Sequence, residues 1–496
     1  MPPAGPACIT CREKCRKCDR GRPNCQRCIS KGLLCRGYPD QFRFCGIASR
    51  GKWKNASIPA NEKTTKSESS TEVASRESTS ARRRSTRLAI DSILAKPAPE
   101  LPDNITTLLK SNETKTLINH YDTFICPHQV AEIGDAKDNP YRAYIIPLAK
   151  KQIGLLYSVL GLSAVHLGRM TEDTTLYETT AVEYRVKAIQ ALGEQIRQSQ
   201  NTSLSEEEQD AVLATIQLLL LHDIAETGIS EHGIHITGAM SVCKSILIAE
   251  GLFHGGRPRA LFFLGNLAWL DIIRAFAGTR RLCFTQDIRE MVARAGGHLF
   301  ELVNGCPREI FLIIGRALDK AKEYKLGWTT DDDFRSTLLF AKHELYSWDP
   351  KAKTYPSSDS CWLSLAVAFQ FACVLHILRL LDPAQPASSV EIQAPVNRIL
   401  DATADIPVDS TLSELLIMPL FMAGADALSR HSQYYVLARF REIERRSEMR
   451  NPVPADLLKK VWAARAAQEP DNEENISWRE FTCFPELTWQ HDYLII

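Results

Sequence analysis

The sequence of 496 residues lacks the motifs that mark several common classes of enzyme. It contains no G-x-S-x-G nucleophile motif, no H-E-x-x-H zinc-hydrolase motif and no glycine-rich phosphate loop. Its first residues, MPPAGPACITCREKC, also lack the apolar stretch of a signal peptide. We therefore expect a protein that is not an enzyme and that works in a reducing compartment.

Cysteine is scarce outside the segment 1–45, which holds eight of the 15 cysteines in the chain. In a reducing compartment, closely spaced cysteines bind metal ions more often than they form disulfides. The other seven are scattered singly along the chain, and we expect them to pack in a hydrophobic core.

Large apolar residues are nearly absent from residues 55–100, where serine, threonine and charged residues dominate. Such a segment cannot offset its ordering entropy by burying apolar surface, so it predicts a disordered linker. Residues 1–54 hold 13 basic and three acidic residues, a net charge of +10, whereas residues 101–496 carry −11. This asymmetry predicts a polyanion-binding module at 1–54 that the linker joins to a separate domain at 101–496.

From Leu101 onward, apolar residues recur at helical spacing and alternating strand patterns are scarce. One helix face carries Leu155, Val159 and Leu167, and another helix begins at the capping box of Ser205 and Glu208. Further periodic stretches lie at about 176–198, 235–250, 259–277, 308–324, 333–345, 361–381, 391–404, 411–430 and 434–447. The pattern predicts an all-α domain of roughly a dozen helices, without the fixed repeat of a solenoid.

Two apolar segments of this region have competing interpretations. The uncharged stretch Cys361–Leu378 is long enough for a membrane span, but Ser364, Gln370 and His376 favour a buried core helix. The tail from Glu469 to Asp492 mixes acidic and aromatic residues, as an activation segment does, although packing on the domain is the favoured interpretation.

The segment 1–35 contains two copies of the spacing Cys-x2-Cys-x6-Cys, the first starting at Cys8 and the second at Cys25. Two tetrahedral zinc ions need eight Zn–S contacts, which six thiolates supply only if two of them bridge the ions. The sequence therefore predicts two zinc ions as cofactors. The candidate metal ligands are Cys8, Cys11, Cys18, Cys25, Cys28 and Cys35.

This segment, CITCREKCRKCDRGRPNCQRCISKGLLC, resembles the fungal C6 binuclear zinc cluster transcription factors. Asp19 matches the acidic residue after the third cysteine, and Pro23 matches the proline two residues before the fourth. The resemblance implies that Cys8 and Cys25 bridge the two ions. The remaining ligands would be Cys11 and Cys18 for one ion, and Cys28 and Cys35 for the other.

The resemblance extends to the helical region over roughly residues 111–480. The segments NPYRAYIIPLAKKQIGLLYSVLGLSAVHL, SELLIMPLFMAGADALS and VWAAR…ISWRE look like the fungal-specific transcription factor domain. This implies that the body is a regulatory domain, which controls the zinc cluster or recruits transcription machinery or co-regulators.

The stretch REKCRK between Cys11 and Cys18 places cations on more than one face of a short helix, so some can bind phosphates and others base edges. A basic arm with interleaved aromatic residues follows the cluster, and the aromatic residues could equally tether the arm to the cluster. The candidate DNA-binding residues are Arg12, Lys14, Arg16, Lys17, Arg43, Lys52 and Lys54. The resemblance implies double-stranded DNA with CGG-type half-sites as the partner.

Cys15 departs from the family pattern, in which this position is usually a lysine that contacts a guanine. Lys14 or Arg16 would have to compensate if a CGG triplet is read. Cys15 also forms the ligand-like pair Cys15-x2-Cys18, which would suit a single four-cysteine zinc or an iron–sulfur site. The binuclear arrangement is favoured because it also accounts for the doubled spacing, Cys35 and Pro23.

A second basic cluster lies in the linker and predicts a nuclear import signal. It consists of Arg82, Arg83, Arg84 and Arg87. No heptad pattern follows Cys35, so both monomeric binding and a homodimer formed through the helical body stay open.

These observations lead to two hypotheses. The first is a nuclear, sequence-specific transcription factor for RNA polymerase II, which by the resemblance regulates metabolic or biosynthetic cluster genes. The alternative is a DNA-independent nuclear co-regulator or thiol-sensing interaction protein, in which Cys15 has removed base recognition.

Overall fold

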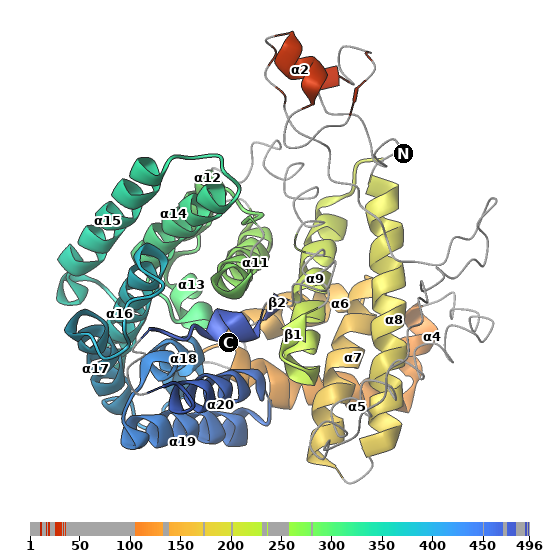
Figure 1. Ribbon diagram of the computed structural model, residues 1–496. Coiled ribbons are helices and arrows are strands. Elements are labelled where there is room, and N and C mark those ends of the chain that lie inside the picture. The colour runs from red at the N-terminus through yellow and green to blue at the C-terminus, as the bar shows by residue number, and fades with distance from the viewer. Residues whose placement is uncertain are drawn as a thin grey trace, which may run out of the picture. The chain divides into compact units, whose positions relative to one another are not determined.

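The computed structural model divides the chain into two units, residues 1–75 and residues 76–496 (Figure 1). The described residues of the first unit are 10–11, 16, 18–19, 25–31, 33 and 35. Those of the second unit are 105–131, 138–171, 174–199, 202–230, 236, 257–278, 281–449, 451–469, 474–482, 492–493 and 495. The predicted basic arm, the predicted linker with its import signal, and all but Ile236 of the predicted helix at 235–250 lie outside these residues.

The first unit contains a short helix, α2 (Gln26–Ser30), that starts directly after Cys25. Cys25 has extended backbone angles, and its Sγ accepts a hydrogen bond from the N–H of Cys28 at 3.3 Å. After the helix, the N–H of Leu33 returns to the carbonyl of Cys28 at 2.9 Å. The helix start and the following turn therefore fix the positions of two cysteines.

The described part of the second unit is almost entirely helical, as predicted. Its first half contains α4 (Ile105–Lys110), α5 (Asn112–His120), π-helix η1 (Tyr121–Ile125), 3₁₀-helix η2 (Cys126–Gln129), π-helix η4 (Tyr141–Ile145), α6 (Ile146–Ala149), α7 (Ile153–Met170), α8 (Thr174–Ser199) and α9 (Glu206–Glu226). Its second half contains β1 (Ile229–Ser230), α11 (Pro258–Ala277), α12 (Gln286–Ala295), α13 (Gly297–Asn304), α14 (Arg308–Lys325), α15 (Asp331–Ser347), 3₁₀-helix η6 (Pro350–Ala352), α16 (Cys361–Leu381), α17 (Val390–Ala404), 3₁₀-helix η7 (Thr411–Leu416), α18 (Ile417–Asp426), α19 (Arg430–Ser447), α20 (Val453–Ala466), 3₁₀-helix η8 (Trp478–Phe481) and β2 (Asp492–Tyr493).

The two halves meet where α9 packs against α11 (Figure 1). Helix α7 packs along α8 and α9, and α11 also contacts α12, α13 and α14. The strands β1 and β2 form one antiparallel pair in which Ile229 lies opposite Tyr493. This two-residue ladder is the only sheet among the described residues, so the fold class is all-α.

Helix α9 shows how local sequence sets a helix start. Ser205 accepts the N–H of Glu208, and the Glu208 carboxylate accepts the N–H of Ser205 at 2.8 Å, which completes the predicted capping box. From Asp210 to Ala225 every residue of α9 is buried. A helix that is buried on all sides belongs to the interior of a large domain.

Three helices, α7, α11 and α16, are long and apolar enough to cross a membrane by length and composition alone. In the structure, neighbouring helices of the domain bury 72% of the apolar window of α7, 100% of that of α11 and 72% of that of α16. The stretch Cys361–Leu381 is therefore a core helix, as its polar residues indicated.

The predicted single helix at 411–430 is wrong. The chain instead forms η7 and α18, leaves the helical conformation after Asp426, and begins α19 at Arg430. The reason is Ser429, whose backbone is extended and whose hydroxyl accepts the N–H of Ser432 at 3.0 Å. This N-cap starts a new helix, whereas the previous one has already ended at Ala427, whose backbone is extended. The sequence analysis also missed several helices that are short or flanked by glycine or proline, namely α4, α5, α6, α12, α13 and α20.

The segment 474–482 near the C-terminal end packs on the helical domain, as favoured. Ser477 and Glu480 form a second capping box, and Trp478 packs edge-on against Phe421 with ring centroids 5.0 Å apart. Arg479 donates to the carbonyl of Phe276 at 3.0 Å. Residues 483–491 of the tail lie outside the described residues.

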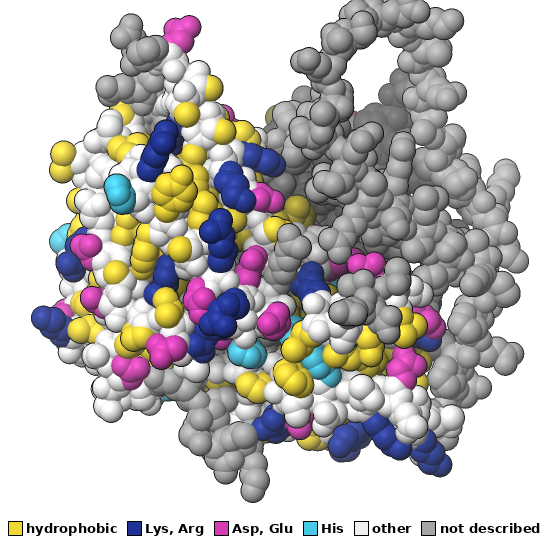
Figure 2. All heavy atoms as spheres, turned by 90° about the horizontal axis from the view of Figure 1, so that it is seen from below, with side chains coloured by type: hydrophobic (Ala, Val, Ile, Leu, Met, Phe, Trp, Pro, Cys, Tyr) yellow, Lys and Arg dark blue, Asp and Glu magenta, His cyan; other side chains and the backbone are white. Residues whose placement is uncertain are grey.

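The surface of the helical domain carries both signs of charge. Figure 2 shows one face on which basic and acidic side chains are interspersed, with hydrophobic side chains between them. This face differs from the segment 1–54, in which basic side chains outnumber acidic ones by ten.

Candidate metal centre

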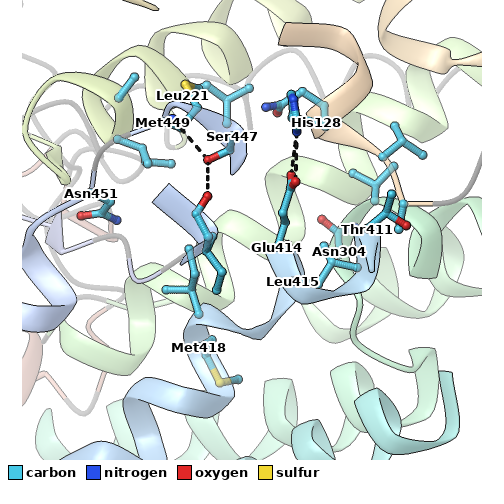
Figure 3. Close-up of a pocket in the computed structure, with 18 of the residues that line it drawn as sticks. His128, Leu221, Asn304, Thr411, Glu414, Leu415, Met418, Ser447, Met449 and Asn451 are labelled. Atoms are coloured by element: carbon cyan, nitrogen blue, oxygen red, sulfur yellow. Dashed lines mark hydrogen bonds and ion pairs between the residues drawn. The ribbon is translucent and has the colours of Figure 1, made fainter. Parts of the chain in front are cut away.

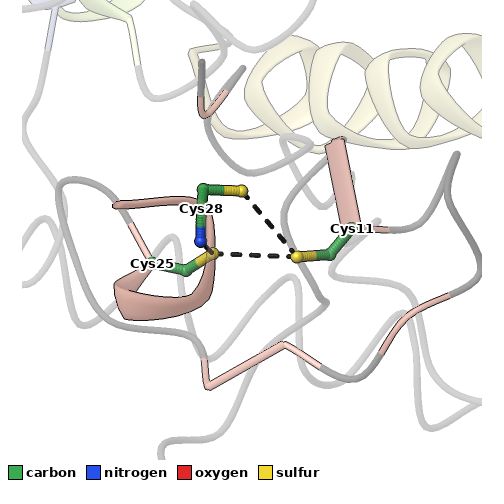
Figure 4. Close-up of side chains that lie close together, drawn as sticks. All are labelled: Cys11, Cys25 and Cys28. Carbon is green, nitrogen blue, oxygen red and sulfur yellow. Dashed lines mark hydrogen bonds between the residues drawn. The ribbon is translucent and has the colours of Figure 1, made fainter. Parts of the chain in front are cut away.

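Three cysteine thiols lie close together in the first unit (Figure 4). The Sγ atom of Cys11 lies 3.7 Å from that of Cys25 and 3.9 Å from that of Cys28. All three side chains are fully buried, and Cys18, Leu33 and Cys35 pack against them. Cysteines from both copies of the repeat therefore converge on one point.

The spacing of the three sulfur atoms fits zinc. A Zn–S bond is about 2.3 Å long, so two thiolates on one tetrahedral zinc ion lie about 3.8 Å apart. The distances of 3.7 and 3.9 Å match this edge. Sulfur donors are also the ligands that structural zinc sites favour.

Cys25 occupies a central position in the cluster. Its Sγ lies within 4.8 Å of the ligand atoms of Cys11 and Cys28, and it belongs to a second such group with Cys18 and Asp19. This position suits a bridging ligand. The Sγ atoms of Cys11 and Cys28 are almost as close to each other as those of Cys11 and Cys25. The assignment of Cys11 and Cys28 to different zinc ions therefore rests on the family resemblance and not on these distances.

The structure describes some of the other predicted ligands but not all of them. Cys35 is partly buried against the cluster. Cys8, the second predicted bridge, lies outside the described residues, as does Cys15. The structure therefore places five of the six predicted ligands near one another, and the assignment of all six as zinc ligands stays a prediction.

Asp19 links the two halves of the cysteine repeat. Its carboxylate oxygens accept the backbone N–H groups of Gln26 at 2.9 Å and Arg27 at 3.0 Å, at the start of α2. A carboxylate at a helix start binds N–H groups that have no partner within the helix. This contact explains why an acidic residue suits the position directly after Cys18.

Arg27 supplies a positive charge next to the sulfur atoms, and the sequence analysis did not single it out. Its Nη1 donates to Cys11 Sγ at 3.7 Å. Two zinc ions and six thiolates sum to a charge of −2, which a neighbouring guanidinium stabilises. The signal in the sequence was its place between Cys25 and Cys28, inside the ligand repeat.

Among the predicted DNA-binding residues, the structure describes Arg16 alone. It is exposed, and its backbone N–H donates to the carbonyl of Cys11 at 2.9 Å. Predicted positions outside the described residues are Arg12, Lys14, Lys17, Arg43, Lys52, Lys54, Arg82, Arg83, Arg84 and Arg87.

The cysteines of the helical domain have a different environment. Cys126, Cys306 and Cys373 are fully buried among apolar residues, and burial raises the pKa of the Cys126 thiol to about 12. Burial also raises the pKa of the Cys373 thiol. A metal ligand must be a thiolate, so these side chains act as core residues, as expected.

Comparison with known families agrees with both regions of the chain. Residues 6–44 match the fungal Zn(2)-Cys(6) binuclear cluster domain, which binds two zinc ions. Residues 116–491 match the fungal specific transcription factor domain. Searches of curated proteins and of solved structures found no match. Because the second match covers most of the sequence, this chain belongs to the fungal specific transcription factor domain family, and it is a fungal transcription factor with a binuclear zinc cluster.

Proposed function

We propose that this chain is a nuclear, sequence-specific DNA-binding regulator of RNA polymerase II transcription. The observation that carries the proposal is the convergence of Cys11, Cys25 and Cys28 at zinc-ligand spacing, in a segment that matches the binuclear cluster domain. Metabolic or biosynthetic cluster genes are the proposed targets, and the helical domain is the proposed site of control and of contacts with co-regulators or a second copy of the chain.

Each part of the chain has a proposed role. The six cysteines hold two zinc ions, with Cys8 and Cys25 as bridges. The cations at Arg12, Lys14, Arg16 and Lys17 bind DNA, supported by the exposure of Arg16. The arm residues Arg43, Lys52 and Lys54 bind phosphates. Residues 1–54 form the DNA-binding module, 55–100 the linker and 101–496 the regulatory domain.

Competition binding with the full chain tests the proposal. Labelled DNA with a CGG half-site is displaced by unlabelled CGG or scrambled DNA at several salt concentrations. Phosphate contacts should make the affinity fall steeply with salt. The proposal expects stronger competition by CGG DNA. Equal competition by both DNAs would favour the co-regulator alternative.

Substitution of Cys15 locates the base contact. Cys15→Lys restores the family's usual residue and should strengthen binding to CGG DNA by about 1–3 kcal/mol, while nonspecific binding barely changes. The matched control is Cys45→Lys, which adds the same charge outside the cysteine repeat. If the unmodified chain already prefers CGG and Cys15→Lys adds nothing, Lys14 or Arg16 carries the recognition.

Nuclear import is proposed to use Arg82, Arg83, Arg84 and Arg87. Replacing all four with alanine should shift a fluorescent fusion toward the cytoplasm, with the basic residues of the cluster module supplying the remaining import. An unchanged nuclear signal after both basic regions are neutralised would contradict this role.

A further inference from the structure

Helix α15 has an outer face that is both exposed and apolar. Figure 1 shows α15 at the edge of the helical domain, with α14 and α16 on its inner side, and both of these helices contact it. Phe334, Leu338 and Leu345 of α15 are buried on that inner side. On the outer side, Leu339 is 50% exposed and Phe340 is 60% exposed. The helix therefore has a second apolar face, which the described part of the domain does not bury.

Exposed apolar side chains are concentrated around this face. Among the described residues, six of the 14 exposed large hydrophobic side chains lie between Tyr324 and Tyr346. Val390, the first residue of α17, is 83% exposed and lies in the same area, because its neighbour Glu391 forms an ion pair with Lys342 of α15 at 3.2 Å. Contiguous exposed apolar patches mark interaction surfaces, and aromatic residues are enriched at the centres of interfaces.

The spacing of the exposed residues on α15 fits contact with another helix. They recur along α15 at alternating steps of four and three residues, at Asp332, Ser336, Leu339, His343 and Tyr346. A repeat that averages about 3.5 residues keeps one stripe of a helix in contact with a partner helix, as in a coiled coil. The outer face of α15 is therefore suited to a helical partner.

The two ends of α15 carry opposite charges that have no partner in the domain. Its first turn contains the exposed residues Asp331, Asp332 and Asp333, and the 3₁₀-helix η6 that follows its other end contains the exposed Lys351. Asp331 pairs with Arg335, and Asp333 also has a cationic partner. Asp332 and Lys351 form no ion pair with any described residue. The surface is therefore complementary in charge to an inverted copy of itself.

We propose that the outer face of α15 binds the same face of a second copy of this chain, with the two helices antiparallel. A two-fold axis near Leu339 and Phe340 brings these side chains of the two copies together. The same axis places Asp332 of each copy beside Lys351 of the other. Because each copy uses the same surface, the contact closes at a dimer.

This inference deepens the proposed role of the helical domain in contacting a second copy. The dimer would carry two zinc cluster modules and would suit DNA with two half-sites, a consequence that rests on the proposed function. Self-association itself does not rest on it. The experiments therefore measure mass without DNA, so their failure is distinguishable from a failure of DNA binding.

Sedimentation velocity of the zinc-loaded full chain provides the first test. We expect the mass to rise from that of one chain toward that of two between about 1 and 100 µM, which is the affinity range of a small interface. A chain that remains monomeric at all these concentrations would overturn the proposal and would leave the surface to a different protein.

A charge placed in the apolar centre locates the contact. Leu339→Glu should weaken the dimer by about 100-fold, because it buries a carboxylate at the centre of the interface. The matched control is Tyr434→Glu, at a side chain that is 68% exposed on α19, and it should leave the dimer unchanged. At concentrations where the parent chain is monomeric, substitutions on this exposed face should barely change thermal melting, which checks the fold. A dimer of parent-like affinity in Leu339→Glu would overturn the proposal.

Exchange of the end charges tests the antiparallel arrangement. Asp332→Lys and Lys351→Asp each place like charges together at two points of the dimer, so each should weaken it by about tenfold. In an equal mixture, a chain of one variant and a chain of the other again pair opposite charges at both points. The mixture should therefore dimerise with nearly the parent affinity, which also shows that both variants are folded. A mixture that associates no better than either variant alone would contradict the antiparallel pair.

Discussion

The two units of this chain use cysteine in opposite ways. In the first unit, Cys11, Cys25 and Cys28 form the buried centre themselves, and Leu33 is the one aliphatic residue described against them. In the helical domain, Cys306 and Cys373 are single members of a large apolar core. Burial raises the pKa of both core thiols, whereas metal ligation requires thiolates. We infer that the folding of the first unit depends on metal binding, whereas the folding of the helical domain depends on hydrophobic burial.

Removing a bridging ligand should have the largest effect. Cys25→Ser should lose both zinc ions and unfold the first unit, because structural zinc binding contributes about 10–16 kcal/mol to folding in comparable small domains. Native mass spectrometry of the full chain counts the ions. Cys15→Ser is the matched control and should keep two, while one zinc in the parent chain would contradict the binuclear assignment.

A core truncation should act on the other unit alone. Phe421 is fully buried and packs against Trp478, so Phe421→Ala should lower the free energy of unfolding of the helical domain by about 3–5 kcal/mol. Chemical denaturation measures this loss, and the zinc count should stay at two. The control is Phe340→Ala, at a side chain that is 60% exposed on α15, where the change should stay within about 0.5 kcal/mol.

Acid should weaken the helical domain through a buried histidine pair. His120 Nε2 lies 2.8 Å from His166 Nδ1, and burial lowers the pKa of His120 from 6.5 to about 4. Between pH 6.5 and pH 4, His120 is protonated in the unfolded chain but neutral in the folded chain. The contribution of this group to the free energy of unfolding is therefore unchanged above pH 6.5 and decreases as the pH falls toward 4. From pH 7 to pH 5 the loss should be about 1–2 kcal/mol for this group.

Denaturation curves of His120→Gln at the two pH values check the assignment. The variant should show a smaller stability difference between pH 7 and pH 5 than the parent chain. His343→Gln, at an exposed position on α15, should leave that difference unchanged. A parent-like difference in His120→Gln would mean that other groups cause the acid sensitivity.

The smallest expected effect concerns the carboxylate that joins the two halves of the cysteine repeat. Asp19→Ala leaves the N–H groups of Gln26 and Arg27 without their acceptor and should destabilise the zinc-bound unit by about 1 kcal/mol. Asp19→Asn keeps one acceptor oxygen and should lose less. Competition with a zinc chelator measures both variants, and equal zinc retention in parent and Asp19→Ala would rule out this contribution.

Much of the architecture could be predicted because it depends on local patterns. The helical spacing of apolar residues predicted the helix at 361–381 with both ends correct. The capping box at Ser205 correctly predicted the start of α9. The cysteine spacing similarly named Cys11, Cys25 and Cys28 before the structure brought them together. In each case the residues that carry the signal lie within a few turns of chain or within one short repeat.

Features that depend on distant segments could not be predicted in this way. The break between α18 and α19 depends on Ser429 acting as an N-cap, which the continuous apolar pattern at 411–430 concealed. A cavity in the helical domain (Figure 3) is lined by Tyr141, Gln217 and Glu414, which lie in separate segments of the sequence and form no recognisable motif. The contact of Arg27 with Cys11 likewise depends on the folded path of the chain.

One measurement tests the division of labour between the units most directly. Zinc is removed from the full chain with a chelator while DNA binding is followed by fluorescence anisotropy and helix content by circular dichroism. We expect selective binding to CGG DNA to disappear and to return when zinc is restored, while the helical signal changes little. Selective binding that survives zinc removal, or a helical signal that collapses with it, would contradict the account.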